Sequence, residues 1–459
     1  MKSLLVKISN KFNAQGGFVK AVSILVGGTA ISQLISIIIL PFITRLYSPL
    51  EFSVFSVYIS LLSIISVASC LRFEIAIPIP TKDEDALSLL ILALISNFII
   101  TLCVVIIIFI FGDIIVKILN QPNFSSYLWL IPIGIFFSGL YNGLQYWATR
   151  KKQFTVLAKT RIFQAVGGAT TQVSLGLLKY GVTGLIIGQI VNYSSGTLRL
   201  ILNLIQDIKY LNKKITLKRI GFNLKKYENF PKYSTLEVLA NTGGIQLPIV
   251  IIAALSLGAE AGYLMLAMQV LGIPMKFIGG AISQVYLSHA PKAFEQGNIR
   301  EYTIEVLNKL FKFSFGVLIF IGIISPVIVE YIFGSQWKNV GIIISWMIPW
   351  FVLQLISSPI SMVMHIANRQ KMMLILTLFG FFLKIIVIYI QYYINSKYLL
   401  QAYAISSAIF YLVCYLVFSK IALLKLNDHI ELIRKTIFPS FCMLILAISV
   451  VFCFKWSGL

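Results

Sequence analysis

Long apolar runs separated by short polar stretches dominate the chain. A helix that crosses a bilayer needs about 20 apolar residues, and many runs here have that length. They fall at 21–44, 53–78, 86–111, 127–149, 161–180, 183–205, 233–256, 262–288, 306–330, 341–366, 372–394, 399–419 and 437–454. The pattern predicts an all-α polytopic membrane protein with up to thirteen spanning helices.

The longest polar stretch, residues 206–232, divides these runs into six before it and six after it. We therefore expect two parallel six-helix bundles around a central cavity. The N-terminal bundle covers 21–205, the C-terminal bundle covers 233–421, and 206–232 is a basic cytoplasmic linker.

The two ends of the chain lie outside this symmetry. Residues 1–20 are basic and mildly amphipathic, which predicts a cytoplasmic segment along the membrane surface. Residues 422–459 form a C-terminal extension. Its apolar run at 437–454 either spans the membrane as a thirteenth helix or packs as an appendage.

Composition and charge support the membrane assignment. Hydrophobic residues make up 58% of the 459 residues and charged residues only 12%, whereas a soluble domain carries roughly 25% charged residues. The 38 Lys and Arg against 16 Asp and Glu give a net charge of +22. Of the basic residues, 28 lie in the stretches assigned to the inside. This asymmetry is the positive-inside pattern, which places the N-terminus in the cytoplasm and argues against nucleic-acid binding.

Two lysines lie near the middle of expected spans. A charge at the bilayer centre costs about 2.5–3.5 kcal/mol on insertion scales, so Lys276 and Lys384 need a functional reason. Arg199 and Arg72 lie nearer the cytoplasmic helix ends, where snorkelling is an equal explanation. We predict that these four residues, Lys276, Lys384, Arg199 and Arg72, form a cationic substrate-binding site.

Neutral polar side chains recur at helical spacing on the same expected helices. Residues seven apart are close to two turns apart, so each set lies on one face. The predicted cavity lining is Gln33, Asn142, Gln145, Gln189, Asn192, Gln269, Ser283, Thr377 and Gln391. The alternative is hydrogen bonding between packed helices, which is common for such residues.

The sign of these charges favours an anionic substrate, most plausibly a phosphate. The sequence has no Walker motif, no GxSxG and no clustered metal ligands, and its five cysteines lie in apolar runs without CxxC spacing. We therefore expect neither an enzyme nor a cofactor or metal site.

Three short segments resemble a known family. They are LYSPLEFS at 46–53, LRFEIAIP at 71–78 and NRQK at 368–371. Together with the helix pattern they resemble the O-antigen type polysaccharide flippases of the multidrug/oligosaccharidyl-lipid/polysaccharide exporter superfamily, over about residues 18–421. The additional run at 437–454 departs from the twelve-span members.

The resemblance implies a substrate, a place and partners. Such flippases move undecaprenyl-pyrophosphate-linked oligosaccharides to the outer leaflet of the bacterial inner membrane by alternating access, for O-antigen and lipopolysaccharide synthesis. Coupling to protons or sodium would follow by analogy, and the polysaccharide polymerase and chain-length machinery are the expected partners.

Three alternatives stay open. A multidrug antiporter of the same superfamily would require an acidic cavity, which the sequence lacks. A lipid II flippase has similar chemistry and usually fourteen helices. A membrane polysaccharide polymerase or transferase would bring large outer loops with catalytic carboxylates, which are not seen here.

Overall fold

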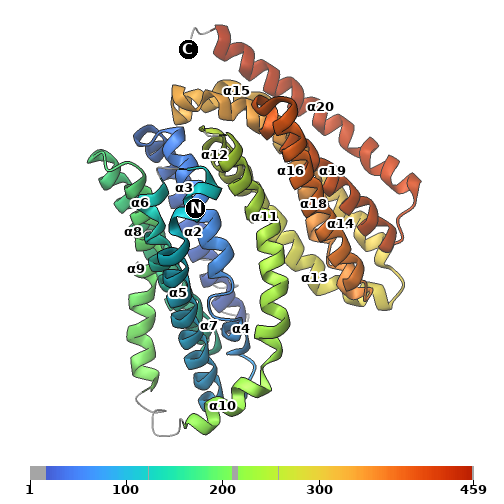
Figure 1. Ribbon diagram of the computed structural model, residues 1–459. Coiled ribbons are helices and arrows are strands. Elements are labelled where there is room, and N and C mark those ends of the chain that lie inside the picture. The colour runs from blue at the N-terminus through green and yellow to red at the C-terminus, as the bar shows by residue number, and fades with distance from the viewer. Residues whose placement is uncertain (1–16, 122–123, 209–215, 257, 457–459) are drawn as a thin grey trace, which may run out of the picture. The chain divides into compact units, whose positions relative to one another are not determined.

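The computed structural model describes residues 17–121, 124–208, 216–256 and 258–456. These residues form helices joined by short turns and contain no strand, as Figure 1 shows. The chain divides into two compact units. Unit 1 comprises residues 1–47 and 57–246, and unit 2 comprises 48–56 and 247–459. The expected surface segment 1–20 lies outside the described residues up to residue 16.

Unit 1 contains the first group of helices. They are α2 (Gly17–Leu46), the second half of α3 (Pro49–Ser66), α4 (Phe73–Ala76), α5 (Asp83–Leu119), α6 (Ser125–Leu128), α7 (Leu130–Arg150), α8 (Phe154–Leu177), α9 (Val182–Ile208), α10 (Leu217–Lys226), the π-helical turn η3 (Phe230–Ser234) and the first half of α11 (Thr235–Ser256). In unit 1, α8 packs against both α2 and α9, and α7 packs against α5 and α9.

Unit 2 contains the start of α3, the end of α11 and the helices that follow. They are α12 (Glu260–Pro274), η4 (Met275–Gly279), α13 (Gly280–Glu295), α14 (Ile299–Phe313), η5 (Ser314–Leu318), α15 (Ile319–Phe333), η6 (Ser335–Trp337), α16 (Lys338–Ile360), α17 (Val363–Ile366), α18 (Gln370–Asn395), η7 (Ser396–Tyr398), α19 (Leu399–Ile421) and α20 (Leu426–Trp456). Within this unit α16 packs against α15 and α19, α18 against α19, and α20 against α14 and α15.

Ten segments of the described residues are long and apolar enough to cross a membrane. They are Ser23–Leu46, Pro49–Ser66, Asp83–Leu119, Ser125–Arg150, Phe230–Ser256, Glu260–Glu295, Ile299–Phe333, Ser335–Ile366, Gln370–Ile421 and Leu426–Phe454. The chain is therefore a multi-pass, all-α membrane protein, because in hydrocarbon only a helix satisfies its backbone groups within one segment.

This set differs from the thirteen expected spans in two places. Gln370–Ile421 contains two helices, α18 and α19, which correspond to the runs at 372–394 and 399–419. Helices α8 and α9 correspond to the runs at 161–180 and 183–205 and have 24 and 27 residues. They are not among the ten because Gly, Thr, Gln, Asn and Ser make them less apolar.

Small residues explain why α8 and α9 pack so closely. A Cβ on Gly168 would come within 3.2 Å of the Gly188 carbonyl oxygen, and one on Gly188 within 3.0 Å of the Gly168 carbonyl. The two backbones therefore touch at these glycines, as small residues allow in membrane helix pairs. Tyr47 holds the end of α2 to α8 by donating from its hydroxyl to the Gln172 carbonyl at 2.6 Å.

The expected span at 53–78 is not one continuous helix. Helix α3 ends at Ser66, and Leu71 and Arg72 adopt left-handed backbone conformations before α4 begins. Backbone turns continue across the break, with the Ala68 N–H donating to the Ile65 carbonyl and the Ser69 N–H to the Ser66 carbonyl. Ser69 Oγ also donates to the Ser66 carbonyl at 2.9 Å, and Cys70 Sγ lies 3.3 Å from the Gly139 carbonyl on α7. Sequence hydropathy does not detect this break, because every residue across it is small or apolar until Arg72.

Candidate functional site

The segment α12–η4–α13 carries an exposed polar stripe although it is apolar enough to span a membrane. Gln269, Lys276 and Gln284 are exposed, and Ser283 is half-buried. A charged side chain that faces lipid at this depth would be strongly unfavourable. This face of the segment is therefore suited to a hydrated or polar surrounding.

Lys276 lies at a local irregularity of this segment. It belongs to the π-helical turn η4, which follows Pro274 directly. Proline removes a backbone donor, and π-helical turns occur often at functional sites. A Cβ added to Gly272 or to Gly280 would meet no atom within 4 Å. The backbone on either side of Lys276 is therefore open to approach.

Lys384 has a different surrounding in the same unit. Its side chain is only 6% exposed. The Lys384 ammonium lies 4.8 Å from the ring centroid of Phe410 and 5.8 Å from that of Tyr411, both on α19. The aromatic faces of α19 thus cover the cation and stabilise it by cation–π attraction.

The other polar residues of α18 form bonds within their own helix. Thr377 Oγ1 donates to the Met373 carbonyl at 3.0 Å, and Gln391 Nε2 donates to the Asn395 carbonyl at 2.9 Å. These local bonds satisfy their donors, as is common for polar residues in membrane helices.

In unit 1 the predicted arginines have protein partners. Arg199 is exposed on α9, and its guanidinium lies 5.9 Å from the ring centroid of Phe163. Arg72 lies at the break before α4, and its Nη1 is 3.6 Å from Oε1 of Glu74. The side chain of Glu74 is 5% exposed, so this carboxylate offsets much of the Arg72 charge locally.

The predicted neutral lining residues of unit 1 are all half-buried. Asn192 on α9 donates from Nδ2 to the Gln164 carbonyl on α8 at 3.0 Å, which is a bond between packed helices. Gln145 accepts through its backbone carbonyl from Thr149 Oγ1 at 2.8 Å. The half-buried set is Gln33, Asn142, Gln145, Gln189 and Asn192.

The four cationic residues are therefore split evenly between the units: Arg72 and Arg199 belong to unit 1, and Lys276 and Lys384 to unit 2. Within unit 2, Lys276 is accessible while Lys384 is covered. Their roles as substrate ligands stay predictions.

Sequence reasoning missed Arg161. This residue lies on α8 and donates from Nη1 to Thr29 Oγ1 on α2. In the sequence it is the first residue of the expected span 161–180. Thr29 is a polar residue of the first apolar run, and its hydroxyl donates to the Leu25 carbonyl of its own helix at 2.8 Å while accepting from Arg161.

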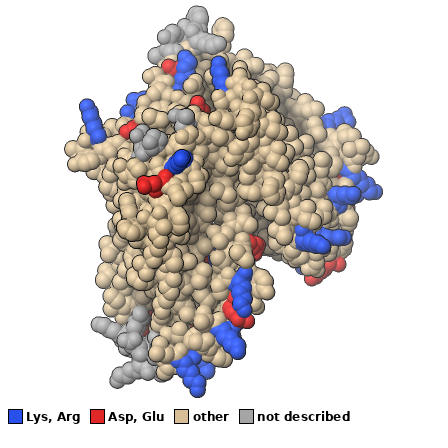
Figure 2. Space-filling view, viewed as in Figure 1, with Lys and Arg blue, Asp and Glu red and all other residues tan. Residues whose placement is uncertain are grey.

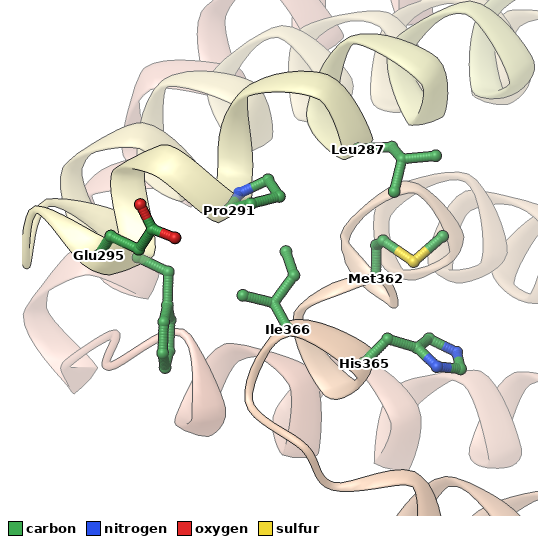
Figure 3. A pocket seen from close by; sticks show the side chains of 7 residues that line it. Leu287, Pro291, Glu295, Met362, His365 and Ile366 are labelled. Carbon is green, nitrogen blue, oxygen red and sulfur yellow. The ribbon is translucent and has the colours of Figure 1, made fainter.

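Unit 2 also contains a largely apolar cavity of about 470 Å³. Figure 3 shows Leu287, Pro291 and Glu295 of α13 facing Met362, His365 and Ile366. Phe294 completes the lining. Such walls suit an apolar chain better than a phosphate group. Among the described residues no cluster of His, Cys, Asp and Glu could hold a metal ion.

Comparison with known proteins identifies the family. A family model described as "Polysaccharide biosynthesis protein" matches residues 42–342, well over half of the chain. The fold and the site define a multi-pass helical membrane protein with a cationic polar stripe. The chain belongs to this polysaccharide biosynthesis protein family. No curated protein sequence matches it.

Solved structures show the same fold at low identity. The lipid II flippase MurJ in an inward closed conformation is 16% identical, with a TM-score of 0.67, covering 94% of this chain and 97% of that one. An inward-facing multidrug resistance MATE family transporter is 15% identical, with a TM-score of 0.63 over 90% and 98%. A MOP superfamily transporter from Pyrococcus furiosus is 14% identical, with a TM-score of 0.55 over 90% and 95%. The fold of this chain is therefore similar to the folds of these transporters.

Proposed function

We propose that the protein is a flippase for undecaprenyl-pyrophosphate-linked oligosaccharides. It moves them from the cytoplasmic to the outer leaflet by alternating access, for O-antigen-like surface polysaccharide of the lipopolysaccharide type. Membership of the polysaccharide biosynthesis family supports the pathway. The MOP transporter fold supports the mode of action.

The observation that carries this proposal is the exposed Lys276 on a membrane-spanning segment. An accessible ammonium in a polar stripe attracts a pyrophosphate, because charge-assisted hydrogen bonds to phosphate oxygens are strong. Gln269 and Gln284 on the same face offer hydrogen bonds to sugar hydroxyls. Lys384 in the same unit and the exposed Arg199 of unit 1 are further proposed phosphate ligands, whereas the charge of Arg72 is largely offset by Glu74.

The membrane potential favours the proposed direction of transport. Moving one charge across 100 mV changes its free energy by about 2.3 kcal/mol. The free energy of an anionic head group therefore falls when it leaves a negative cytoplasm, by roughly 4–5 kcal/mol per 100 mV for two charges. Coupling to protons or sodium would add to this driving force.

The proposed setting is the bacterial inner membrane, with the N-terminus in the cytoplasm. The distribution of Lys and Arg supports this orientation. The polysaccharide polymerase and the chain-length machinery would use the exported units, so they are the proposed partners.

The test is deletion of the gene and complementation with wild type or Lys276→Gln. We expect that deletion abolishes surface polysaccharide and that lipid-linked precursor then accumulates on the inner leaflet. Lys276→Gln should insert normally and fail to restore transport, whereas Lys309→Gln, an exposed lysine on α14, should restore it. Surface polysaccharide that persists after deletion would overturn the proposal.

The similarity to MurJ makes lipid II flipping the second candidate. The same strain separates the two functions. Loss of surface polysaccharide with intact peptidoglycan supports the proposal. Loss of peptidoglycan synthesis, with lipid II accumulating, supports the second candidate instead. Sensitivity to cationic drugs without either defect would indicate a multidrug antiporter.

A further inference from the structure

Helix α10 is held firmly to unit 1 by one of its faces. Thr216 caps its start by accepting from the Arg219 backbone N–H. The Arg219 Nε donates to Asp85 Oδ1 at 2.7 Å, and the buried Asn223 donates to the same oxygen at 3.3 Å. Because Asp85 lies in the first turn of α5, these bonds attach α10 to the start of that helix.

Apolar contacts reinforce this attachment. Tyr227 is 8% exposed and belongs to the buried cluster that contains Trp147 and Leu87, and Ile220 packs against it. Arg219 and Ile220 lie four and three residues before Asn223, and Tyr227 lies four residues after it, so the four residues share one face of the helix. This face binds unit 1, and the remaining faces are free for another contact.

The outward faces of α10 combine exposed apolar and basic side chains. Leu217 is 88% exposed, Phe222 63% and Leu224 47%. Lys218, Lys225 and Lys226 are exposed between and beside them. Figure 2 shows basic side chains gathered at this end of unit 1. Apolar side chains next to lysines are the composition of helices that lie in a membrane–water interface.

The chain places α10 at such an interface. Helix α10 ends at Lys226, and the membrane-spanning segment Phe230–Ser256 begins four residues later. Four residues reach at most about 14 Å. The other attachment point, Asp85, lies at the start of the span Asp83–Leu119. Figure 1 shows α10 running crosswise to α5 and α9 at the end of unit 1.

The next residues continue the same surface. Tyr233 is 70% exposed and Leu236 is 65% exposed. Tyrosines are enriched at the level of lipid head groups. Lys232 bonds to Glu228 at 2.8 Å, and this hydrogen bond holds the pKa of the Glu228 carboxyl below its usual range. Lys232 is thus paired with Glu228, and Lys218, Lys225 and Lys226 supply the other positive charges of this surface.

We propose that α10 is a binding site for anionic phospholipids of the leaflet that it borders. Leu217 and Leu224, seven residues apart on one flank of the helix, enter the boundary of the acyl chains, and Lys218, Lys225 and Lys226 contact the lipid phosphates. Each basic residue close to an anionic leaflet strengthens the attachment about fivefold. This lipid site is on α10, whereas the polar stripe with Lys276 is on α12–η4–α13. The lipid proposal therefore does not depend on the proposed substrate.

The test is hydrogen–deuterium exchange of the full chain in nanodiscs of phosphatidylcholine, with or without phosphatidylglycerol. We expect residues 216–227 to exchange several-fold more slowly when the anionic lipid is present. The triple variant K218Q/K225Q/K226Q should lose this difference, and 1 M salt should reduce it in the wild type. Leu224→Ser should speed exchange in both lipid mixtures.

A control variant isolates the position of the charges. K117Q/K179Q/K397Q removes the same number of exposed positive charges elsewhere in the chain, and it should keep the full lipid dependence at 216–227. Equal exchange with and without phosphatidylglycerol, or a lipid dependence that survives in the α10 triple variant, would overturn the proposal.

Discussion

The ammonium of Lys384 on α18 lies 4.8 Å from the ring centroid of Phe410 on α19. A cation that sequence analysis places in an open cavity is thus covered by an aromatic face. Cation–π attraction at desolvated sites is worth about 2 kcal/mol, which offsets only part of the cost of burying an ammonium. Lys384 therefore reduces stability, which is typical of residues retained for function.

This relationship leads to the first prediction. Lys384→Met keeps the volume and removes the buried charge, so the melting temperature should stay the same or rise. If Lys384 binds the pyrophosphate as proposed, transport should fall by about tenfold or more, because a hydrogen bond to a charged group contributes about 1.5–3 kcal/mol. Thermal melting in detergent and a flipping assay measure the two effects. A large drop in melting temperature with normal transport would make Lys384 structural.

A second prediction concerns Gly262 on α12. A Cβ at this position would overlap the Pro49 carbonyl oxygen and lie 2.8 Å from the Ser53 backbone nitrogen. Backbone atoms cannot move aside easily, so Gly262→Ala should destabilise unit 2 by about 1–3 kcal/mol. Gly272→Ala on the same helix meets no atom within 4 Å and is the matched control. Equal melting temperatures for the two variants would contradict the prediction.

A third prediction concerns the attachment of α20. Arg300 on α14 donates from Nε and Nη2 to the two oxygens of Asp428, at 2.9 and 2.7 Å. This two-point geometry depends on the carboxylate, so Asp428→Asn should lower the melting temperature. Glu431→Gln makes the same change in an exposed pair with Lys435 on the same helix, and it should have little effect. Proteolysis that releases α20 only from the Asp428 variant would support the assignment.

A fourth prediction concerns Arg150 at the end of α7. Its Nε and Nη2 bond to Asp83 Oδ1 at 3.0 and 2.9 Å, and Nη1 and Nη2 also reach the carbonyls of Ile77 and Thr81. A lysine lacks this planar fork, so Arg150→Lys should destabilise unit 1 by about 1.5–3 kcal/mol.

The neighbouring lysine provides the control for that experiment. Lys151 forms a single ion pair with Asp83 at 2.6 Å and is more exposed than Arg150. Lys151→Met should therefore change the melting temperature less than Arg150→Lys does. The opposite order would show that the charge of the ion pair, rather than the geometry of the guanidinium, holds the segment from Ile77 to Asp83.

Much of the fold could be predicted from the sequence. Apolar runs predict helices because a membrane leaves the backbone no other local way to satisfy its hydrogen bonds. The run at 437–454 accordingly lies within α20. The break at Leu71 and Arg72 could not be predicted, because the residues before Arg72 are small or apolar and the contact of Cys70 with the Gly139 carbonyl on α7 forms only when the chain has folded.

The candidate site shows the same division between sequence and tertiary structure. Lys276 and Lys384 each lie between polar residues seven positions away, so the sequence predicts that each shares a helix face with them, although the π-helical turn η4 interrupts this period between Lys276 and Ser283. Only the tertiary structure decided that Lys276 is exposed and that Phe410 and Tyr411 cover Lys384. Spacing along a helix fixes the direction of a side chain, whereas its surroundings depend on which other helix packs against that face.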